Sequence, residues 1–265
     1  MRSYKIERKY LVSKNKLVKQ KSRKPLSSTV LLGFALSVVV IITIAISILG
    51  YRFGWWRHPE AFSIFEWATY AAIIALIASG YGAFKARLQG RHRGLLLGMT
   101  GIALSLPVIT ATVLFEYSAK VYPGINDIST DTQDPPSFWD VPNPMEYPGQ
   151  VAADLQQAAY PDLSPLPLPV SPEQAFEQAL IVITDKGWEV IAKVPNDGRI
   201  EAIDTSLLFG FKDEVVVRIT PSNDGAIVDV RSRSRIGRID RGANAKRIRD
   251  YLKSLKERVA RLHKS

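Results

Sequence analysis

Three long apolar runs occupy the first 117 residues of the chain, and a polar region with shorter hydrophobic periods follows them. Residues 28–50 and 94–115 contain no charged side chain, and residues 61–84 contain only Glu66. At about 1.5 Å per residue, each run is long enough as a helix to cross a hydrocarbon core of about 30 Å. The pattern therefore predicts three transmembrane helices followed by a folded domain.

Basic residues predict the orientation of these helices. Ten Lys and Arg residues precede the first run, two lie in the loop after it, and four lie in the next loop. Because positive charge is retained on the cytoplasmic side, we expect a cytoplasmic N-terminus. Three spans then place the domain on the other side, the periplasm of a bacterial inner membrane. The chain divides into a basic cytoplasmic tail (1–27), a membrane anchor (28–117) and an extracytoplasmic domain (118–265).

A retained anchor is favoured over a cleaved signal peptide. The basic leader is long, the first apolar run exceeds a usual signal core, and no small-x-small cleavage pattern precedes a polar chain. Small residues at four-residue spacing, such as Ala75, Ser79 and Ala83, favour close packing of the three helices or contact with a partner helix. Glu66 and Glu116 lie near the expected outer interface and are predicted to reach water rather than to form an ion pathway.

The formal net charge of +10 is unevenly divided. Residues 1–117 carry 16 basic and 4 acidic side chains, whereas residues 118–265 carry 19 basic and 21 acidic ones. The excess suits attraction to anionic headgroups of the cytoplasmic leaflet, so nucleic acid is not expected as a partner. The chain has no cysteine and three histidines, which excludes disulfides, thiolate metal sites and a cysteine nucleophile. We expect no metal ion and no cofactor.

The C-terminal domain has an α+β pattern. Eleven prolines between residues 121 and 172 predict an extended wrap over the domain, with a short helix near residues 150–159. Ser171 followed by Pro172 is typical of a helix start. The remaining pattern predicts the following elements: a helix over 171–187, strands over 188–194, 199–209, 214–220 and 226–233, and an amphipathic helix over 242–263. Four antiparallel strands packed with two helices and the wrap give the expected architecture.

Several short segments resemble a known family. They are Asn126 to Asp131, Pro135-Pro136, Tyr160-Pro161-Asp162, Gly187-Trp188, Gly198 to Ala202, and Val228 to Asn244. In this order they are similar to the bacterial and plastid family called domain of unknown function 1499, over roughly residues 120–258. A three-span anchor before the domain is similar to some bacterial members. The resemblance implies no particular activity.

The sharpest constellation in the domain is a cluster of basic residues near its C-terminus. Residues 231–264 carry 13 basic and 3 acidic side chains, whereas residues 118–230 carry 6 and 18. Guanidinium groups beside a helix N-terminus suit phosphate or carboxylate. The candidate anion- or partner-binding residues are Arg231, Arg233, Arg235, Arg238, Arg241 and Asn244.

Two interpretations of this cluster compete. The arginines pair with carboxylates of the domain, or they hold a lipid headgroup phosphate or an acidic partner surface. The candidate pairing acids are Asp127, Asp131, Glu201, Asp229 and Asp240. No catalytic residue is assigned, because no histidine is placed to activate the serines between the arginines. A calcium site formed by Asp127, Asp131 and Asp134 is a further alternative, although turn and capping roles suit these residues better.

The pattern as a whole favours a non-enzymatic accessory protein of the bacterial inner membrane. Its expected partners are the lipid bilayer and either an anionic lipid headgroup or an acidic surface of a membrane-protein complex. The alternative is an envelope hydrolase or transferase that uses the arginines as an anion clamp. That alternative requires a pocket in which a carboxylate such as Glu201 or Asp229 faces the arginines with room for a substrate.

Overall fold

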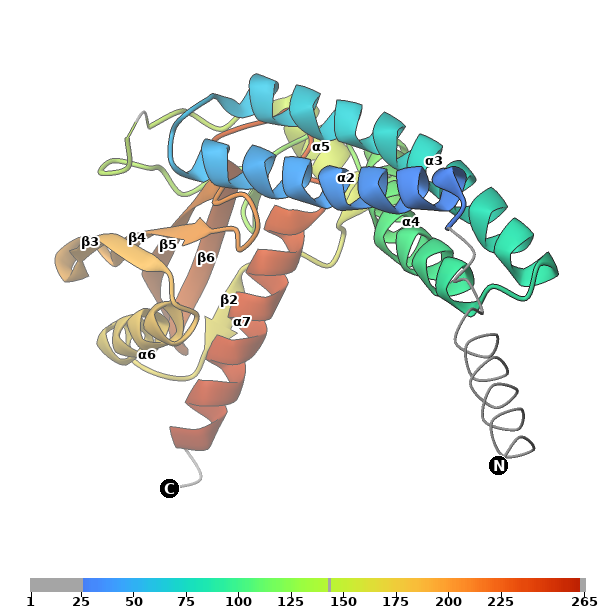
Figure 1. Cartoon of the computed structure of the whole chain (residues 1–265). Coiled ribbons are helices and arrows are strands. Elements are labelled where there is room, and N and C mark those ends of the chain that lie inside the picture. Colours follow the sequence, from blue (N-terminus) through green and yellow to red (C-terminus); the bar gives the residue numbers. More distant parts are fainter. Residues whose placement is uncertain (1–25, 143, 263–265) are drawn as a thin grey trace, which may run out of the picture. The chain divides into compact units, whose positions relative to one another are not determined.

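The computed structural model describes residues 26–142 and 144–262 (Figure 1). The chain forms two compact units, one of which comprises residues up to 47 together with 59–110. The second comprises residues 48–58 and 111–265. The basic residues of the predicted tail before residue 26, and His263, lie outside the described residues.

Three long apolar helices account for the predicted anchor. They are α2 (Ser28–Arg52), α3 (His58–Leu88) and α4 (His92–Val121). Each is long and apolar enough to cross a membrane, as the three apolar runs predict. The chain is therefore associated with a membrane through its N-terminal half.

Small residues let the helices of the first unit approach closely. A Cβ added at Gly98 would lie 2.6 Å from the Ala83 Cβ, and one added at Gly101 would collide with the Ser79 hydroxyl. Ser37 donates from Oγ to the Gly101 carbonyl at 3.1 Å. These contacts show the close packing that small residues at helical spacing allow.

The second unit contains a six-stranded antiparallel sheet, and the prediction of an α+β fold is confirmed. The strands are β1 (Asp127–Ser129), β2 (Leu166–Leu168), β3 (Glu189–Val194), β4 (Arg199–Thr205), β5 (Lys212–Ser222) and β6 (Gly225–Ser234). Their order is β1-β6-β5-β4-β3, and β2 also pairs with β6. The four long strands match those predicted, while the wrap supplies β1 and β2 to the two halves of one edge of β6.

Two helices cover one face of the sheet (Figure 1). They are α6 (Pro172–Asp185), which begins with Ser171 accepting a hydrogen bond from the Gln174 backbone, and α7 (Ala243–Leu262). Alternate strand residues such as Val215, Val217 and Val230 point to this face and are fully buried. Trp188 stacks on Tyr251 of α7 with ring centroids 5.5 Å apart, and together these side chains form the main hydrophobic core.

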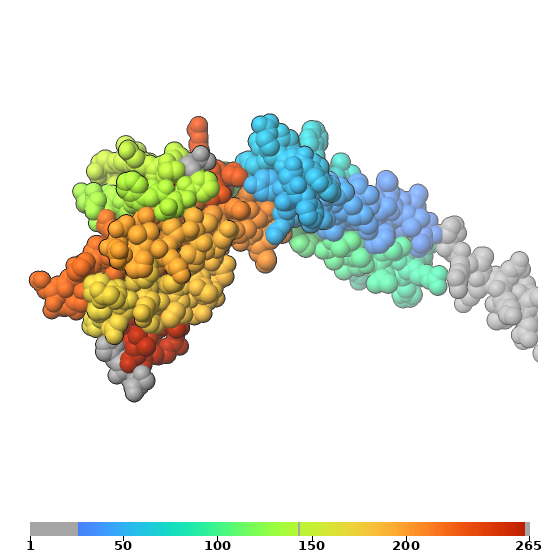
Figure 2. All heavy atoms as spheres, turned by 90° about the vertical axis from the view of Figure 1, so that its left-hand side faces the viewer, coloured from blue at the N-terminus to red at the C-terminus, as the bar shows by residue number. Residues whose placement is uncertain are grey.

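Part of the proline-rich segment between α4 and α6, including Phe138 and Val141, lies over the opposite face. The segment also contains α5 (Gln150–Ala159), at the position predicted for a short helix. Phe138 and Val141 of this segment pack on Val216 of β5. Figure 2 shows the segment, in green, resting on the strands, with α7, in red, on the far side of them. The sheet is therefore covered on both faces, by helices on one and by an extended wrap on the other.

The predicted strand over residues 199–209 is too long. β4 ends at Thr205, and residues 206–211 form the connection to β5. Apolar residues alone do not distinguish a strand from an apolar turn, and the sequence Leu207-Leu208-Phe209 continues the hydrophobic pattern of β4. This connection forms one wall of the candidate site described below.

Candidate functional site

The face of the sheet under the wrap is charged, in contrast to the apolar face under the helices. Side chains alternate along a strand, so Asp229, Arg231 and Arg233 of β6 share this face with Glu214 and Arg218 of β5. Arg231, Glu214 and Asp229 are all buried. Buried charges are tolerated only when they are paired and hydrogen-bonded, and the pairs described below meet that requirement.

Arg231 is at the centre of the charged face and is 1% exposed. Its Nε and Nη2 donate to the two carboxylate oxygens of Asp127 at 2.9 and 2.8 Å. Its Nη1 and Nη2 also donate to the carbonyls of Pro136 and Met145, at 3.1 and 3.0 Å. Its guanidinium carbon also lies 4.9 Å from the Phe138 ring centroid. Arg231 therefore fastens the wrap to β6 and has no surface left for a ligand.

Glu214 joins the next two arginines of the predicted cluster. It is fully buried, and its Oε2 accepts from the Nε of Arg233 at 2.6 Å. Its Oε1 accepts from the Nε of Arg235 at 2.7 Å. Arg233 is buried, whereas the Arg235 side chain remains 27% exposed. The two arginines share one carboxylate, but only Arg235 reaches the surface.

Glu201 holds the wrap from β4. Its carboxylate accepts backbone N–H groups of three consecutive wrap residues, at 2.7 Å from Trp139 and at 2.9 Å from Asp140 and Val141. Arg199 donates to the same carboxylate and to Asp140. Glu201 is fully buried, and its oxygens are occupied by these donors.

Asp229 is paired at the other end of the charged face. Arg218 donates to it at 3.2 Å, and the Thr130 hydroxyl donates to it at 3.0 Å. Arg218 also contacts Asp131 at 3.2 Å and Asp134 at 2.8 Å. The acids of the alternative calcium site are thus divided between two arginines. Among the described residues, no group of three or more acidic or histidine side chains is arranged to hold a metal ion.

Burial raises the pKa of several of these carboxyl groups. Desolvation raises the pKa of Asp127 above its ordinary value, and the ion pair with Arg231 opposes the shift. The pKa of Asp229 is likewise raised by burial, and Arg218 opposes that shift. Burial also raises the pKa of Tyr147, which lies against Arg231, to about 12. These groups are held by the fold rather than exposed to a substrate.

Two further predicted site residues, Asp240 and Asn244, lie just before and at the start of α7. Asn244 is fully buried; its amide donates to the Asn126 carbonyl at 2.9 Å, and its Oδ1 accepts from Ser232 at 2.8 Å. Asp240 caps the helix, accepting from the backbone N–H groups of Gly242 and Asn244 at 2.9 and 2.8 Å. The helix N-terminus expected to attract an anion is therefore occupied by Asp240, a residue of the domain itself.

Arg238 and Arg241 are not brought together with the buried arginines. Arg238 is exposed and forms no ion pair with any residue of 26–142 or 144–262. Arg241 lies at a positive φ of 53°, and its guanidinium sits 3.6 Å from the ring centroid of Phe115. The structure thus separates the predicted cluster into buried ion pairs at Arg231 and Arg233 and more accessible positions at Arg235, Arg238 and Arg241.

Arg235 opens onto a pocket of about 470 Å³ within the second unit. Two further basic residues line it, Arg52 and Lys212, and no acidic side chain is among its described lining residues. The other lining residues are Tyr51, Thr205, Phe209, Gly210 and Ile236. We call this the cationic pocket. Its combination of three cations with aromatic walls suits an anion attached to an apolar body.

The β4–β5 connection forms one wall of the cationic pocket. Ser206 closes it by donating its N–H to the Phe211 carbonyl at 2.8 Å and accepting the Gly210 N–H at 3.0 Å. Gly210 has a positive φ of 76°, a conformation that glycine adopts without strain. Leu207 and Leu208 lie at the tip, 94% and 59% exposed. Arg52 donates from Nη1 to the Leu207 carbonyl at 2.6 Å.

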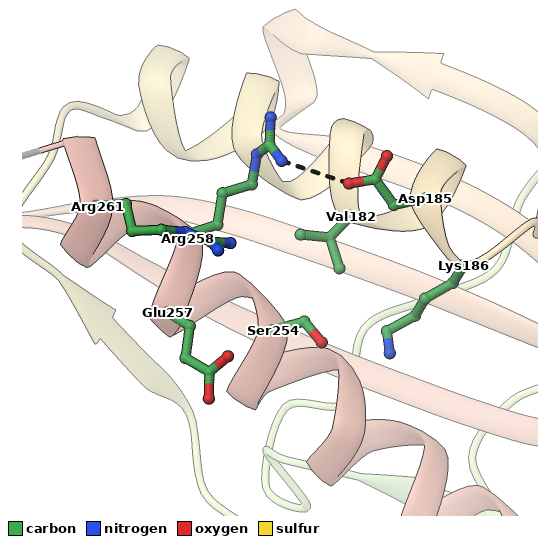
Figure 3. Close-up of a pocket in the computed structure, with 7 residues that line it drawn as sticks. All are labelled: Val182, Asp185, Lys186, Ser254, Glu257, Arg258 and Arg261. Carbon is green, nitrogen blue, oxygen red and sulfur yellow. Dashed lines mark hydrogen bonds and ion pairs between the residues drawn. The ribbon is translucent and has the colours of Figure 1, made fainter.

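Two other hollows are less suited to a single ligand. A cleft of about 280 Å³ between α6 and α7 is shown in Figure 3, where Arg258 reaches across to Asp185 at 3.3 Å. Its lining mixes Lys186 and Arg261 with Glu257, so it offers no uniform charge. A groove of about 510 Å³ beside Trp139 contains Arg199 and Arg218, but both of these arginines are paired with acids of the wrap.

Sequence reasoning misses Arg52, Lys212 and the apolar tip. In the sequence, Arg52 is one of two basic residues in the loop after the first apolar run, and Lys212 falls in a predicted turn. The detectable signal is the run Leu207-Leu208-Phe209-Gly210-Phe211, since turns between strands usually consist of polar residues and glycine. Glu214 is also missed, because an acid inside a strand pattern is not by itself recognisable as the partner of two arginines.

Comparison with known proteins gives a family but no activity. A comparison with curated proteins gave no significant match. Among solved structures, the crystal structure of TTHA0849 from Thermus thermophilus matches with a TM-score of 0.24 and 15% identity. That match covers 37% of this chain and 96% of the other. Residues 127–255 match the family described as "Protein of unknown function (DUF1499)". The resemblance seen in the sequence is thus confirmed, and residues 127–255 form a domain of the DUF1499 family.

Proposed function

We propose that this is a membrane-anchored accessory protein whose C-terminal domain binds the phosphate headgroup of an anionic lipid in the cationic pocket. The observation that carries the proposal is the pocket itself, in which Arg52, Lys212 and Arg235 converge beside an exposed apolar loop. Phosphate is a strong acceptor for such donors, and the apolar wall suits the part of a lipid next to its headgroup.

The three cations keep donors available for a ligand. Lys212 is exposed and forms no ion pair in the described part of the chain. Arg235 contacts Glu214 through Nε, and its two terminal nitrogens form no hydrogen bond within residues 26–142 and 144–262. Arg52 uses Nη1 for the carbonyls of Leu207 and Leu208, at 2.6 and 3.2 Å. The contacts with Glu214 and with these carbonyls orient the two guanidinium groups before a ligand binds.

The length of the connection keeps the domain near the membrane. α4 ends at Val121 and β1 begins at Asp127, so five residues join them. Even fully extended, five residues span no more than about 18 Å. A domain of this size has a diameter of roughly 35–40 Å, which is larger than that tether. A headgroup of the adjoining leaflet is therefore within reach of the domain surface.

The proposed setting follows the distribution of basic residues. The loop between α3 and α4 contains Arg91 and, with the ends of its helices, Lys85, Arg87 and Arg93, whereas the α2–α3 connection contains Arg57 beside Arg52. This asymmetry supports a cytoplasmic N-terminus and a periplasmic domain in a bacterial inner membrane. The adjoining leaflet is then the outer leaflet of that membrane.

The hydrolase or transferase alternative lacks a supporting observation. It would require a carboxylate that faces the arginines across open space. Glu201 is fully buried and accepts four donors, and Asp229 is held by Arg218 and Thr130. A general base needs access to the proton that it removes, and neither of these carboxylates offers it. Binding without chemistry is the function that the described geometry favours.

The first experiment is native mass spectrometry of the full-length protein released from nanodiscs of equal phosphatidylcholine and phosphatidylglycerol. We expect wild-type protein to retain phosphatidylglycerol preferentially. The Lys212→Glu/Arg235→Gln double variant should lose most of this preference, because it removes two pocket cations while the new glutamine amide can still donate to Glu214. Lys256→Glu is the matched control, since Lys256 is an exposed cation on α7.

Two further arms identify the source of the anion. Titration of glycerol 3-phosphate into protein held in phosphatidylcholine nanodiscs should give little binding if an embedded lipid is the ligand. Tight binding there would instead indicate a soluble phosphate compound. A protein that co-purifies with wild type and is lost in the double variant would indicate an acidic partner surface. Equal phosphatidylglycerol retention by wild type and the double variant would contradict the pocket assignment.

A further inference from the structure

We infer that the tip of the β4–β5 connection, residues 206–211, is a wedge that inserts Leu207 and Leu208 into the lipid leaflet beside the domain. The inference deepens the proposed function and rests on its placement of the domain at a membrane surface. It goes beyond headgroup binding, because it assigns a second contact, to the acyl region, and a different set of side chains. It concerns an interaction surface whose partner is the bilayer.

The first observation is the contrast between the two ends of β5. At one end Leu207 and Leu208 are 94% and 59% exposed, although leucine is normally buried. At the other end the β5–β6 turn carries the polar residues Asn223 and Asp224. Two adjacent leucines that are exposed to water are unfavourable, so we infer that the apolar end of β5 has a different environment from the polar end.

The second observation is that the apolar tip is closed by its own hydrogen bonds. Ser206 closes the turn with its backbone N–H and carbonyl, and its hydroxyl accepts the Phe211 N–H at 2.8 Å. Phe209 and Phe211 stack with ring centroids 5.1 Å apart. The two leucines are thus held outward by a closed loop, which lowers the entropy cost of inserting them.

The third observation is the ring of residues around the tip. Tyr51 packs edge-on against Phe211, with ring centroids 5.2 Å apart, and Arg52 binds the carbonyls of both leucines. Lys212 follows the tip directly and is exposed. Aromatic and basic side chains are typical of the membrane–water interface, where rings lie at the headgroup level and cations meet phosphate. Tyr51, Arg52 and Lys212 lie next to the apolar tip. They can therefore stay at the headgroup level while Leu207 and Leu208 enter the acyl region.

The occupant is a lipid leaflet rather than a groove of another protein. Tyr51 and Arg52 are the last residues of α2, which is itself apolar enough to span a membrane. Their contacts with the tip lie within the second compact unit. A loop fastened to the end of a transmembrane helix is at the depth where that helix leaves the hydrocarbon. The adjoining acyl region is then the nearest apolar phase for Leu207 and Leu208.

The absence of cysteine from the sequence permits a clean test. Full-length Leu207→Cys protein is labelled with a nitroxide in phosphatidylcholine nanodiscs, and its collision rates with oxygen and with a water-soluble nickel chelate are measured by electron paramagnetic resonance. Asp224→Cys is the matched control at the opposite end of β5. Positions 207 and 224 flank opposite ends of an 11-residue strand, which is about 34 Å long at a rise of about 3.4 Å per residue. Leu106→Cys, exposed on α4, is the lipid reference.

We expect the label at position 207 to resemble that at 106, with oxygen collisions favoured over nickel, and the label at 224 to show the reverse. Adding Leu208→Asp should shift position 207 toward water. A label at 207 that behaves like the one at 224 overturns the inference, and so does a label shielded from both reagents, which would lie against protein. Leu207→Cys without label, assayed for thermal unfolding, checks that folding is retained.

The outcome is separable from that of the headgroup experiment. Insertion at position 207 in pure phosphatidylcholine, together with no phosphatidylglycerol preference, would support the wedge and contradict the binding of an anionic headgroup. Water exposure at 207 with an intact phosphatidylglycerol preference would do the opposite. Each proposal can therefore fail without the other.

Discussion

Arg231 lies in β6, and Arg235 directly follows the last residue of that strand, yet the two have opposite environments. Arg231 is 1% exposed and makes four hydrogen bonds, to Asp127 and to two carbonyls of the wrap. Arg235 contacts one carboxylate oxygen and opens onto a pocket with two other cations. The difference lies in what covers each residue, since the wrap crosses the strand at Arg231 but not at Arg235. Whether an arginine here is buried in an ion pair or accessible therefore depends on whether the wrap covers it.

The same contrast predicts different effects for substitutions at the buried ion pairs and at the cationic pocket. Removing one partner of a buried ion pair leaves an uncompensated charge, which is costly to stability. Removing an exposed cation changes the local potential and leaves the core intact. We therefore expect the buried pairs to control stability and the cationic pocket to control binding.

The largest expected effect on stability is that of Arg231→Met. It leaves Asp127 buried without its cation and releases two carbonyls of the wrap, so we expect a loss of about 3–5 kcal/mol in the free energy of unfolding. This corresponds to roughly 10 °C in the thermal midpoint of a protein of this size. The measurement is near-ultraviolet circular dichroism of the full chain in nanodiscs, in which the stacked Trp188 and Tyr251 report the core.

Arg249→Met is the matched control for that loss. Arg249 makes a two-point contact with Asp162, but the two side chains are 40% and 56% exposed. Exposed ion pairs are worth at most about 1 kcal/mol, so the shift should be small. The Arg231→Met/Asp127→Leu double variant should regain part of the lost stability. Equal shifts for Arg231→Met and Arg249→Met would break the comparison between buried and exposed arginines.

Glu201→Gln should have the next largest effect. A neutral amide loses the charge-assisted bonds to Arg199, and its NH₂ group faces backbone N–H donors of the wrap. We expect a loss of about 2–3 kcal/mol and faster protease cleavage of the wrap. Limited proteolysis of the full chain in nanodiscs measures the second effect. Glu257→Gln, on the exposed side of α7, should leave the cleavage rate unchanged.

A change in pH is expected to have a smaller effect on stability. Because burial raises the pKa of Asp229, the folded protein binds a proton there more readily than the unfolded chain does. The stability from this neutral form is present below the ordinary pKa of aspartate and is lost as the pH rises through the raised value. The opposite holds for Asp162, whose pKa is lowered by Arg249.

The measurement is the thermal midpoint of wild type and Asp229→Asn from pH 4 to pH 7. Asp229→Asn removes one group whose ionisation opposes folding, so its midpoint should fall less steeply with rising pH than that of wild type. An identical pH dependence in the two proteins would show that Asp229 titrates with an unshifted pKa in the folded state.

The smallest effect on stability is expected at the cationic pocket. Lys212→Glu changes an exposed side chain, so the free energy of unfolding should stay within about 0.5 kcal/mol of wild type. Phosphatidylglycerol retention by the same protein should nevertheless fall severalfold. A stability loss as large as that of Arg231→Met would show that Lys212 belongs to the structural set and would remove the basis of the comparison.

Much of the fold can be read from the sequence because it depends on local patterns. The long apolar runs predict α2, α3 and α4, and the cap at Ser171 predicts the start of α6. Period-two alternation predicts the four long strands. The error at residues 206–209 arises because the same apolar residue types occur in strands and in exposed apolar turns. The three-residue strands β1 and β2 have no detectable period of their own.

The candidate site depends on contacts that the linear pattern does not contain. The sequence by itself determined that the domain is charge-polarised and that its arginines need anions. Only the tertiary structure decided that Asp127 reaches Arg231 across 104 positions and that Glu214 joins Arg233 and Arg235. The physical reason is that pairing energy depends on distance and burial, which are properties of the packed wrap and sheet. Composition fixes how many charges a chain carries, but the covering of one face decides which of them remain available.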